Sequence, residues 1–348
     1  MDKILYQNLK MDIDVSSRDA LYNSIYKVMP YVSNTLLASP SVLYKKIRFY
    51  NNVKNRLSAY HEFLIPKKTG GTRKILAPNS DLKSLMSAIA FILNTMYMPS
   101  DSVMGFVKQR SVLTNAQKHV GNNYVFNIDL SDFFPSITDS MIEAQLLKMN
   151  IPPLAMRIIS SVCTYPQKME GGTYRQVLPQ GSPVSPILSN ICCISLDKAL
   201  EGLAKRFHLT YSRYADDITF SSNHSVYQED GEFMTELQKI IATHHFFINP
   251  KKTRLQKRGT RQEVTGVSVN EKTNVSIKYV KNLRALIHQI ALAKKLSTKK
   301  VNVARGKLNY LRMIKGANDS TYKTLCIKLN LALKGKHFTP KKKRSSVK

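Results

Sequence analysis

Three aspartates stand where the sequence could support metal-dependent phosphoryl chemistry. Asp129 lies near the end of the apolar run Tyr124–Leu130, and Asp216 and Asp217 form a doublet in the run Tyr211–Ser221. A doublet alone in a turn is usually solvated, but carboxylates bordered by apolar strand residues are costly unless a cation balances them. Carboxylate oxygens suit Mg²⁺, and two such ions can stabilise both the attacking and the leaving oxygen of a phosphoryl transfer. The three acids therefore predict a two-magnesium site.

The charge of the chain points to a polyanionic partner. Its formal net charge is +30, with 53 Lys and Arg against 23 Asp and Glu. Residues 251–348 hold 27 of these basic residues and only three acids. The same region keeps a helical stripe at Leu283, Leu286, Ile287 and Ile290. A folded, cationic helical module of this kind indicates contact with nucleic acid.

The elements that must hold the acids follow from periodicity and turn residues. The pattern predicts an α+β fold, because strands alternate with helices of unequal length. We expect mainly helices over 1–60, strands at Glu62–Pro66 and Arg73–Ala77 around a Lys67–Thr72 turn, a helix at Asp81–Met98, a strand at Tyr124–Leu130, a helix within Ser182–Leu200 and a hairpin at Tyr211–Ser221.

Membrane and secreted classes do not fit. The apolar stretch Leu85–Leu93 is far shorter than the roughly 18 residues that a membrane span needs. The first residues lack the apolar core of a signal peptide. The four cysteines form no C-x-x-C pair, so reduced core thiols are a better interpretation than a zinc site or disulfides. We therefore expect a cytoplasmic protein with no membrane partner.

Four motifs occur in the order found in reverse transcriptases. Tyr214–Asp217 (YADD) resembles their YxDD catalytic hairpin, and Asn127–Pro135 (NIDLSDFFP) resembles the segment of the first catalytic aspartate. Leu178–Pro186 (LPQGSPVSP) is similar to their nucleotide loop, and Asn249–Thr253 (NPKKT) to their lysine motif. The resemblance spans roughly residues 60–270 and implies an RNA-directed DNA polymerase that uses dNTPs and two Mg²⁺ ions.

The same resemblance implies a right-hand fold. It would comprise an N-terminal helical region (1–60), fingers (61–120), a palm with an antiparallel sheet (121–270), a basic helical thumb (271–340) and a basic tail (341–348).

Two further strings resemble those of bacterial retron reverse transcriptases. They are N-A-x-x-H at Asn115–His119 and V-T-G at Val264–Gly266. This resemblance implies a structured non-coding RNA as template and primer, priming from the 2′-OH of an internal guanosine, and a branched RNA–DNA hybrid (msDNA) as product. It also implies a protein effector encoded nearby and a role in antiphage defence.

The family's roles carry over to matching residues. Asp129, Asp216 and Asp217 would be catalytic metal ligands, with the carbonyl of Leu130 completing the site. Phe134 would exclude a 2′-OH, although Phe133 and Phe134 could both be core residues. Other nucleotide contacts would come from Gln180, Gly181, Arg73, Lys68 (or Lys67) and Lys252 (or Lys251). An ordinary helix start, solvated hairpin charges and plain RNA contact are the competing interpretations.

RNA contacts are expected from the retron strings and the thumb. These residues are Asn115, His119, Val264, Thr265, Gly266, Tyr279, Lys281 and Arg284. A lone histidine such as His119 is more often a hydrogen-bonded structural residue, and the thumb positions could be ordinary helix surface.

Two alternatives stay open at this stage. One is another bacterial reverse transcriptase, of the abortive-infection, diversity-generating or intron type. The other is mainly a structural scaffold for an RNA–DNA and effector complex. A gene for a structured RNA just upstream would favour the retron, and intact carboxylates argue against a purely structural role.

Overall fold

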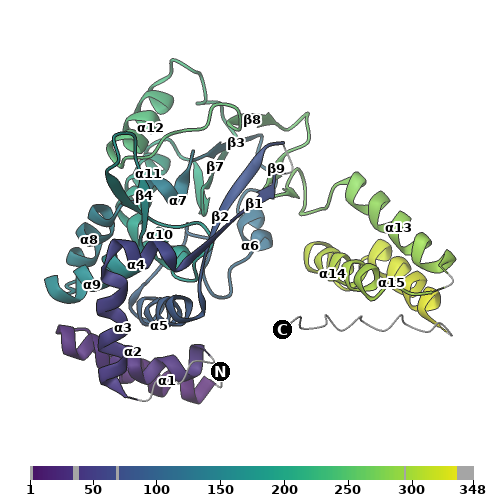
Figure 1. The fold of residues 1–348 in the computed structure, drawn as a ribbon. Helices are drawn as coiled ribbons and strands as arrows, with labels where there is room; N and C mark the ends of the chain where they lie inside the picture. The colour runs from purple at the N-terminus through teal and green to yellow at the C-terminus, as the bar shows by residue number, and fades with distance from the viewer. Residues whose placement is uncertain (1–2, 34–38, 68–69, 294, 335–348) are drawn as a thin grey trace.

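The structure is a computed structural model that describes residues 3–33, 39–67, 70–293 and 295–334. It combines helices and strands as expected for an α+β chain (Figure 1). The helices are α1 (Lys3–Met11), α2 (Arg18–Val32), α3 (Pro40–Asn51), α4 (Val53–Ser58), α5 (Ser80–Met96), α6 (Val112–Gln117), α7 (Phe133–Ser136), α8 (Asp139–Lys148), α9 (Pro153–Cys163), α10 (Ser185–Cys192), α11 (Ile194–Arg206), α12 (Glu232–Thr243), α13 (Ile277–Leu292), α14 (Thr298–Lys315) and α15 (Ser320–Leu333). The strands are β1 (Tyr60–Pro66), β2 (Thr72–Pro78), β3 (Tyr124–Asp129), β4 (Tyr165–Lys168), β5 (Tyr174–Val177), β6 (Thr210–Tyr214), β7 (Asp217–Ser222), β8 (Arg254–Lys257), β9 (Glu263–Val264) and β10 (Val267–Ser268).

The central sheet is antiparallel, with the strand order β6, β7, β3, β8. Tyr214 pairs with Asp217, so Ala215 and Asp216 form the two-residue turn between β6 and β7. On its other side β7 pairs with β3, and Asp217 lies directly opposite Asp129. Cross-strand neighbours share one face of a sheet, so this register alone brings two of the acids together.

Strand β3 separates two apolar clusters. Phe126 and Ile128 belong to the principal core, whereas Val125 belongs to a second cluster that continues into the C-terminal helices. Successive strand residues point to opposite faces. Asp129 therefore shares its face with Val125, and helix α6 and the β9–β10 hairpin contribute Ala116, Val264 and Val267 to the cover of that face.

Helix α5 organises the N-terminal half of the molecule. It packs against α2, α9 and α10, and residues on several of its faces are buried. This packing explains why its sequence is apolar almost all round. In the described part of the chain, no helix is both long and apolar enough to cross a membrane.

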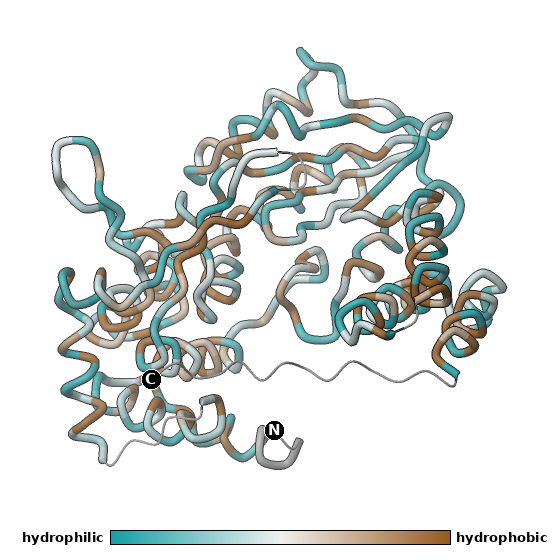
Figure 2. Tube along the Cα trace, turned by 45° about the vertical axis from the view of Figure 1, so that its right-hand side comes forward, coloured by the Kyte–Doolittle hydropathy of each residue, from teal (hydrophilic) through white to brown (hydrophobic). Residues whose placement is uncertain are grey.

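The three helices α13, α14 and α15 form a bundle beside the central body (Figure 1). The predicted stripe is confirmed, because Leu283, Ile287 and Ile290 are buried. Figure 2 shows that the helices of this bundle carry their apolar segments toward one another, with hydrophilic segments outside. Basic residues exposed on the bundle include Lys281, Arg284, Lys300 and Arg305.

Most of the expected elements are found, but the end of one helix and the continuity of another differ from the prediction. The helix expected to reach Met98 ends at Met96, where the backbone becomes extended before Pro99. The helix expected within Ser182–Leu200 is two helices, α10 and α11, which meet at Cys193. The predicted tail at 341–348 lies outside the described residues.

Candidate active site

The three predicted acids meet at one end of the central sheet. Asp129 and Asp217 are cross-strand partners, and the amide of Leu130 donates to the carbonyl of Asp216 at 3.0 Å. That hydrogen bond ties the β6–β7 turn to the end of β3. The doublet and the distant single acid thus come together as the sequence predicts, and the Leu130 amide helps to join them.

Lys252 neutralises Asp129 in this structure. Its Nζ lies 2.9 Å from Oδ1 and 2.8 Å from Oδ2 of that carboxylate, and Nδ2 of Asn249 lies 3.2 Å from Oδ1. The amide of Asn249 also donates to the carbonyl of Asp129 at 2.8 Å. Of the two lysines that the sequence left open, Lys252 therefore reaches the acids, whereas Lys251 is exposed and only its amide is held by Asn249.

The site concentrates negative charge. Loss of solvation raises the pKa of Asp217 to about 7, and the nearby carboxylates of Asp216 and Asp129 add to that rise. Loss of solvation also raises the pKa of Asp216, with Asp129 adding to it and the cations of Lys252 and Arg73 opposing it. Clustered carboxylates of this kind call for a cation.

The residues fit a divalent metal by their chemistry. An ammonium group already stands against both oxygens of Asp129, and Asp217 is exposed at the edge of the site, so an ion can enter from solvent. The described residues hold no group of three or more His, Cys, Asp or Glu gathered tightly enough to bind a metal as they stand. In this structure the Lys252 ammonium is the charge that balances Asp129.

Gly181 lies close against strand β2. We expected a glycine here to allow a close approach of the backbone, and an added Cβ would lie 2.8 Å from both Ile75 Cγ2 and Leu76 O of that strand. The amide of Leu76 donates to the carbonyl of Gln180 at 2.8 Å. With a φ of +128° at Gly181, the loop is fastened to the β1–β2 hairpin.

The same hairpin carries the expected triphosphate cations. Arg73 lies on β2, and its charge acts on Asp216, which places it on the side of the acids. Lys67 is exposed at the end of the hairpin, and Lys68 lies outside the described residues. After the loop, α10 begins at Ser185 with Pro186 in its first turn.

The two adjacent phenylalanines have different environments. Phe133 is buried and stacks on Phe246, with 5.6 Å between ring centroids. Phe134 is only partly buried and lies 6.3 Å from the ring of Phe106. Phe134 is therefore the ring available to a ligand. Phe106 is a candidate site residue that the sequence analysis did not identify. The signal that could have identified it is an aromatic residue directly after Gly105.

The histidine of the first retron string is a structural residue, contrary to the RNA contact expected for it. His119 is fully buried, with Nδ1 2.7 Å from Ser221 Oγ and Nε2 2.7 Å from Ser212 Oγ. Burial lowers the pKa of His119 to about 3. Because the Ser212 hydroxyl donates to Asn115 Oδ1 at 2.6 Å, Nε2 of His119 must carry the proton and donate to Ser212.

The two retron strings are parts of one network. Asn115 is also buried, and its amide reaches the hydroxyl of Thr265 at 3.4 Å. Val264 is buried in the second cluster, so direct RNA contact at Asn115 and Val264 is wrong as well. Thr265 and Gly266 form the turn between β9 and β10 with positive φ values, and Gly266 is exposed. Besides this turn, the exposed residues of the two strings are Gln117 and Lys118, which lie between Asn115 and His119.

The bundle residues also differ from one another. Tyr279 makes contacts within the bundle: its hydroxyl donates to the carbonyl of Lys307 at 2.8 Å, and its ring packs on Tyr310. Lys281 and Arg284 are exposed on α13. Arg284 lines a polar pocket of about 380 Å³ together with Lys328 of α15.

Comparison with known proteins gives a family match. Residues 65–304 match the family described as reverse transcriptase (RNA-dependent DNA polymerase). The chain is 34% identical over 277 residues to the retron Mx65 reverse transcriptase of Myxococcus xanthus, covering 75% of this chain and 62% of that protein. It is 34% identical to the retron Mx162 enzyme of the same species, covering 66% of this chain and 52% of that protein. It is 32% identical over 240 residues to the retron Ec86 reverse transcriptase of Escherichia coli, covering 69% of this chain and 71% of that protein.

The match therefore spans only about half to two thirds of the Myxococcus relatives. Among solved structures, telomerase from Candida albicans in complex with a fragment of telomeric RNA aligns with a TM-score of 0.46 and 11% identity, covering 90% of this chain and 69% of that chain. The family assignment stands on the sequence matches: the chain belongs to the reverse transcriptase family, and within it to the retron reverse transcriptases.

Proposed function

We propose that this chain is an RNA-directed DNA polymerase of a retron. The single observation that carries the proposal is the convergence of Asp129, Asp216 and Asp217 at the end of the central sheet, with Lys252 against the first of them. Family membership supports the reaction type. The polymerase parts would be fingers at 61–120, a palm at 121–270 and a thumb at 271–340, preceded by the helical region 1–60.

The three carboxylates would hold two Mg²⁺ ions. When bound, such ions act as Lewis acids that stabilise charge on a transferring phosphoryl group. The protein's own contribution is to position and neutralise. Asp129, Asp216 and Asp217 fix the ligand oxygens, while Arg73 and Lys252 supply positive charge for a triphosphate.

Sugar selection would depend on Phe134. Its ring is partly exposed, and it lies on α7, which begins four residues after Asp129. A rigid aromatic ring at that level leaves room for a deoxyribose and clashes with a 2′-OH. The Gln180–Gly181 loop, fastened to β2, would form the opposite wall.

The retron part of the proposal concerns the partners. The template and primer would be a structured non-coding RNA, primed at the 2′-OH of an internal guanosine, and the product a branched RNA–DNA hybrid. The exposed cations of the α13–α15 bundle, including Lys281 and Arg284, suit a nucleic acid backbone. An effector protein and a role in antiphage defence are further parts of this proposal.

The experiment compares the wild type with Asp216→Asn and Asp217→Asn on a primed RNA template with dNTPs and Mg²⁺. We expect primer extension by the wild type only, with folded variants by circular dichroism. Extension by either variant would refute the catalytic assignment.

In cells, sequencing of the nucleic acid that co-purifies with the protein should yield cDNA joined to its RNA by a 2′ branch. Unbranched cDNA would favour another class of bacterial reverse transcriptase. Phage protection that persists in the Asp217→Asn strain would favour a scaffold.

A further inference from the structure

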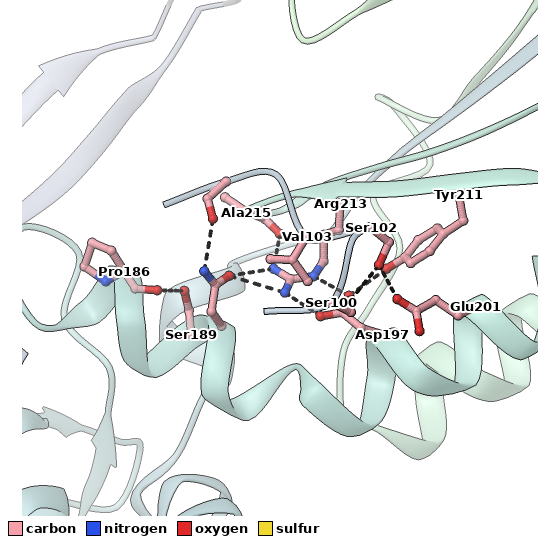
Figure 3. Close-up of polar contacts among 12 residues, drawn as sticks. Ser100, Ser102, Val103, Pro186, Ser189, Asp197, Glu201, Tyr211, Arg213 and Ala215 are labelled. Carbon is pink, nitrogen blue, oxygen red and sulfur yellow. Dashed lines mark hydrogen bonds and ion pairs between the residues drawn. The ribbon is translucent and has the colours of Figure 1, made fainter. Parts of the chain in front are cut away.

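A buried ion pair lies directly behind the turn that carries the acids (Figure 3). Arg213 of β6 is fully buried, and Asp197 of α11 is 2% exposed. The guanidinium is held bidentately, with Nε 2.7 Å from Oδ1 and Nη2 2.7 Å from Oδ2. Tyr211 donates its hydroxyl to the same carboxylate at 2.7 Å. A buried pair of this kind is costly to form because both charges lose their hydration.

The remaining donor of Arg213 reaches the turn itself. Nη1 donates to the carbonyl of Ala215 at 3.1 Å. Ala215 has a φ of +58°, in the left-handed region that residues with a Cβ adopt only when their surroundings hold them there. It is the residue immediately before Asp216. The guanidinium thus holds the peptide group that joins Ala215 to Asp216.

Asn190 and Gly105 make further contacts with Arg213 and with the turn. Asn190 of α10 accepts from Nη1 and Nη2 of Arg213 at 3.3 Å each, and its amide donates to the carbonyl of Gly105 at 3.0 Å. A Cβ on Gly105 would lie 2.5 Å from the amide nitrogen of Ala215. The backbone of residue 105 therefore presses directly on the turn, and Asn190 joins it to the same guanidinium.

We propose that Arg213 is a positioning residue for the metal site. Held by Asp197 and Asn190, it fixes the Ala215 carbonyl and so sets the orientation in which the turn presents Asp216 and Asp217. Because α10 starts four residues after Gly181, the same cluster links the nucleotide loop to the acids. This inference rests on the proposed function of the site.

The test is Arg213→Lys, which keeps a positive charge beside Asp197 but removes the planar donor fork. Two quantities are measured: binding of Mn²⁺ by electron paramagnetic resonance, and the Mg²⁺ concentration that gives half-maximal primer extension. We expect both half-saturation concentrations to rise about tenfold, as the loss of one charge-assisted hydrogen bond implies.

Arg56 provides a matched control. It is also a buried arginine, 2% exposed, and donates to Tyr50 O and Gln176 Oε1 away from the acids. Arg56→Lys should lower thermal stability and leave both half-saturation concentrations within about twofold of the wild type. A general effect of disturbing a buried arginine would shift both variants equally and would overturn the inference.

The outcomes separate this inference from the proposed function. A folded Arg213→Lys protein that binds Mn²⁺ like the wild type overturns the positioning role. If that variant does not fold, Asn190→Ala takes its place, and unchanged Mn²⁺ binding there overturns the role as well. A wild type that binds Mn²⁺ but extends no primer contradicts the polymerase assignment alone, since the Mn²⁺ comparison still decides the role of Arg213.

Discussion

Acidification should destabilise this protein through His119. The imidazole is fully buried between two serine hydroxyls, and its pKa in the folded state is lowered to about 3 by burial. A histidine of this kind contributes stability that is complete above its unfolded pKa of about 6.5 and is lost as the pH falls toward 3. The relevant perturbation is therefore a change from pH 7 to pH 5.

The magnitude follows from proton binding by the unfolded chain. At pH 5 about 97% of unfolded His119 is protonated, whereas the folded state stays neutral. Linkage then gives a loss of about 2 kcal/mol in the free energy of unfolding between pH 7 and pH 5. Other groups titrate in the same interval, so the quantity to compare is the difference between the wild type and a variant that cannot titrate at this position.

The variant is His119→Gln, whose amide can replace both hydrogen bonds to Ser212 and Ser221. Urea unfolding followed by circular dichroism at both pH values gives the two free energies. The wild type should lose about 2 kcal/mol more than the variant. His288→Gln is the control, because His288 is exposed on α13 and its replacement should leave the loss of the wild type unchanged.

Equal losses in the wild type and His119→Gln would refute the argument that this histidine is buried and neutral. RNA binding at pH 7 provides a second check. Because the side chain has no exposed surface, the variant should bind RNA as the wild type does, and a large loss of affinity in the folded variant would restore the RNA contact expected from the sequence.

Three further outcomes follow from the site. Lys252→Met should reduce nucleotide incorporation at least about tenfold because the incoming triphosphate loses a positive charge beside the acids, whereas Lys251→Met should stay within about twofold, as single-turnover extension will measure. Gly181→Ala should destabilise the fold by about 1–3 kcal/mol through its backbone conformation and raise the KM for dNTP, which thermal unfolding and steady-state kinetics will check. Because the pKa of Asp217 is raised, the stability that this carboxyl group contributes is complete below its unfolded pKa and is lost as the pH rises through about 7. In EDTA, Asp217→Asn should therefore lose less stability than the wild type between pH 5 and pH 8.

Local patterns predicted the parts of the fold that are encoded locally. The hairpin around Asp216, the strand ending at Asp129 and the helical stripe at Leu283 all follow from short-range periodicity and turn chemistry. Even the meeting of the acids was predictable, because a family resemblance supplied the pairing that periodicity cannot give. The break at Cys193 was not, since α10 and α11 form one continuous apolar pattern in the sequence.

Roles that depend on burial were the ones that sequence reasoning got wrong. Nothing local distinguishes a histidine in a loop that faces RNA from His119, which is covered by elements nearly 100 residues away in the chain. The close approach of Gly181 to β2 also could not be predicted, because the partner strand lies about 100 residues earlier in the chain. The role of Arg213 was missed because a charged residue within a strand is usually exposed, and its partner Asp197 lies on a separate helix.

The shared use of β3 by two apolar clusters limits how this protein can be divided. Val125 shares a cluster with the C-terminal bundle, only four residues before Asp129. A proteolytic cut near residue 275 would divide the apolar cluster that Val125 shares with the bundle, so we expect the bundle not to behave as a detachable appendage. For the construction of chimaeras between relatives, the bundle, the β9–β10 hairpin and α6 form one cassette that has to be exchanged together.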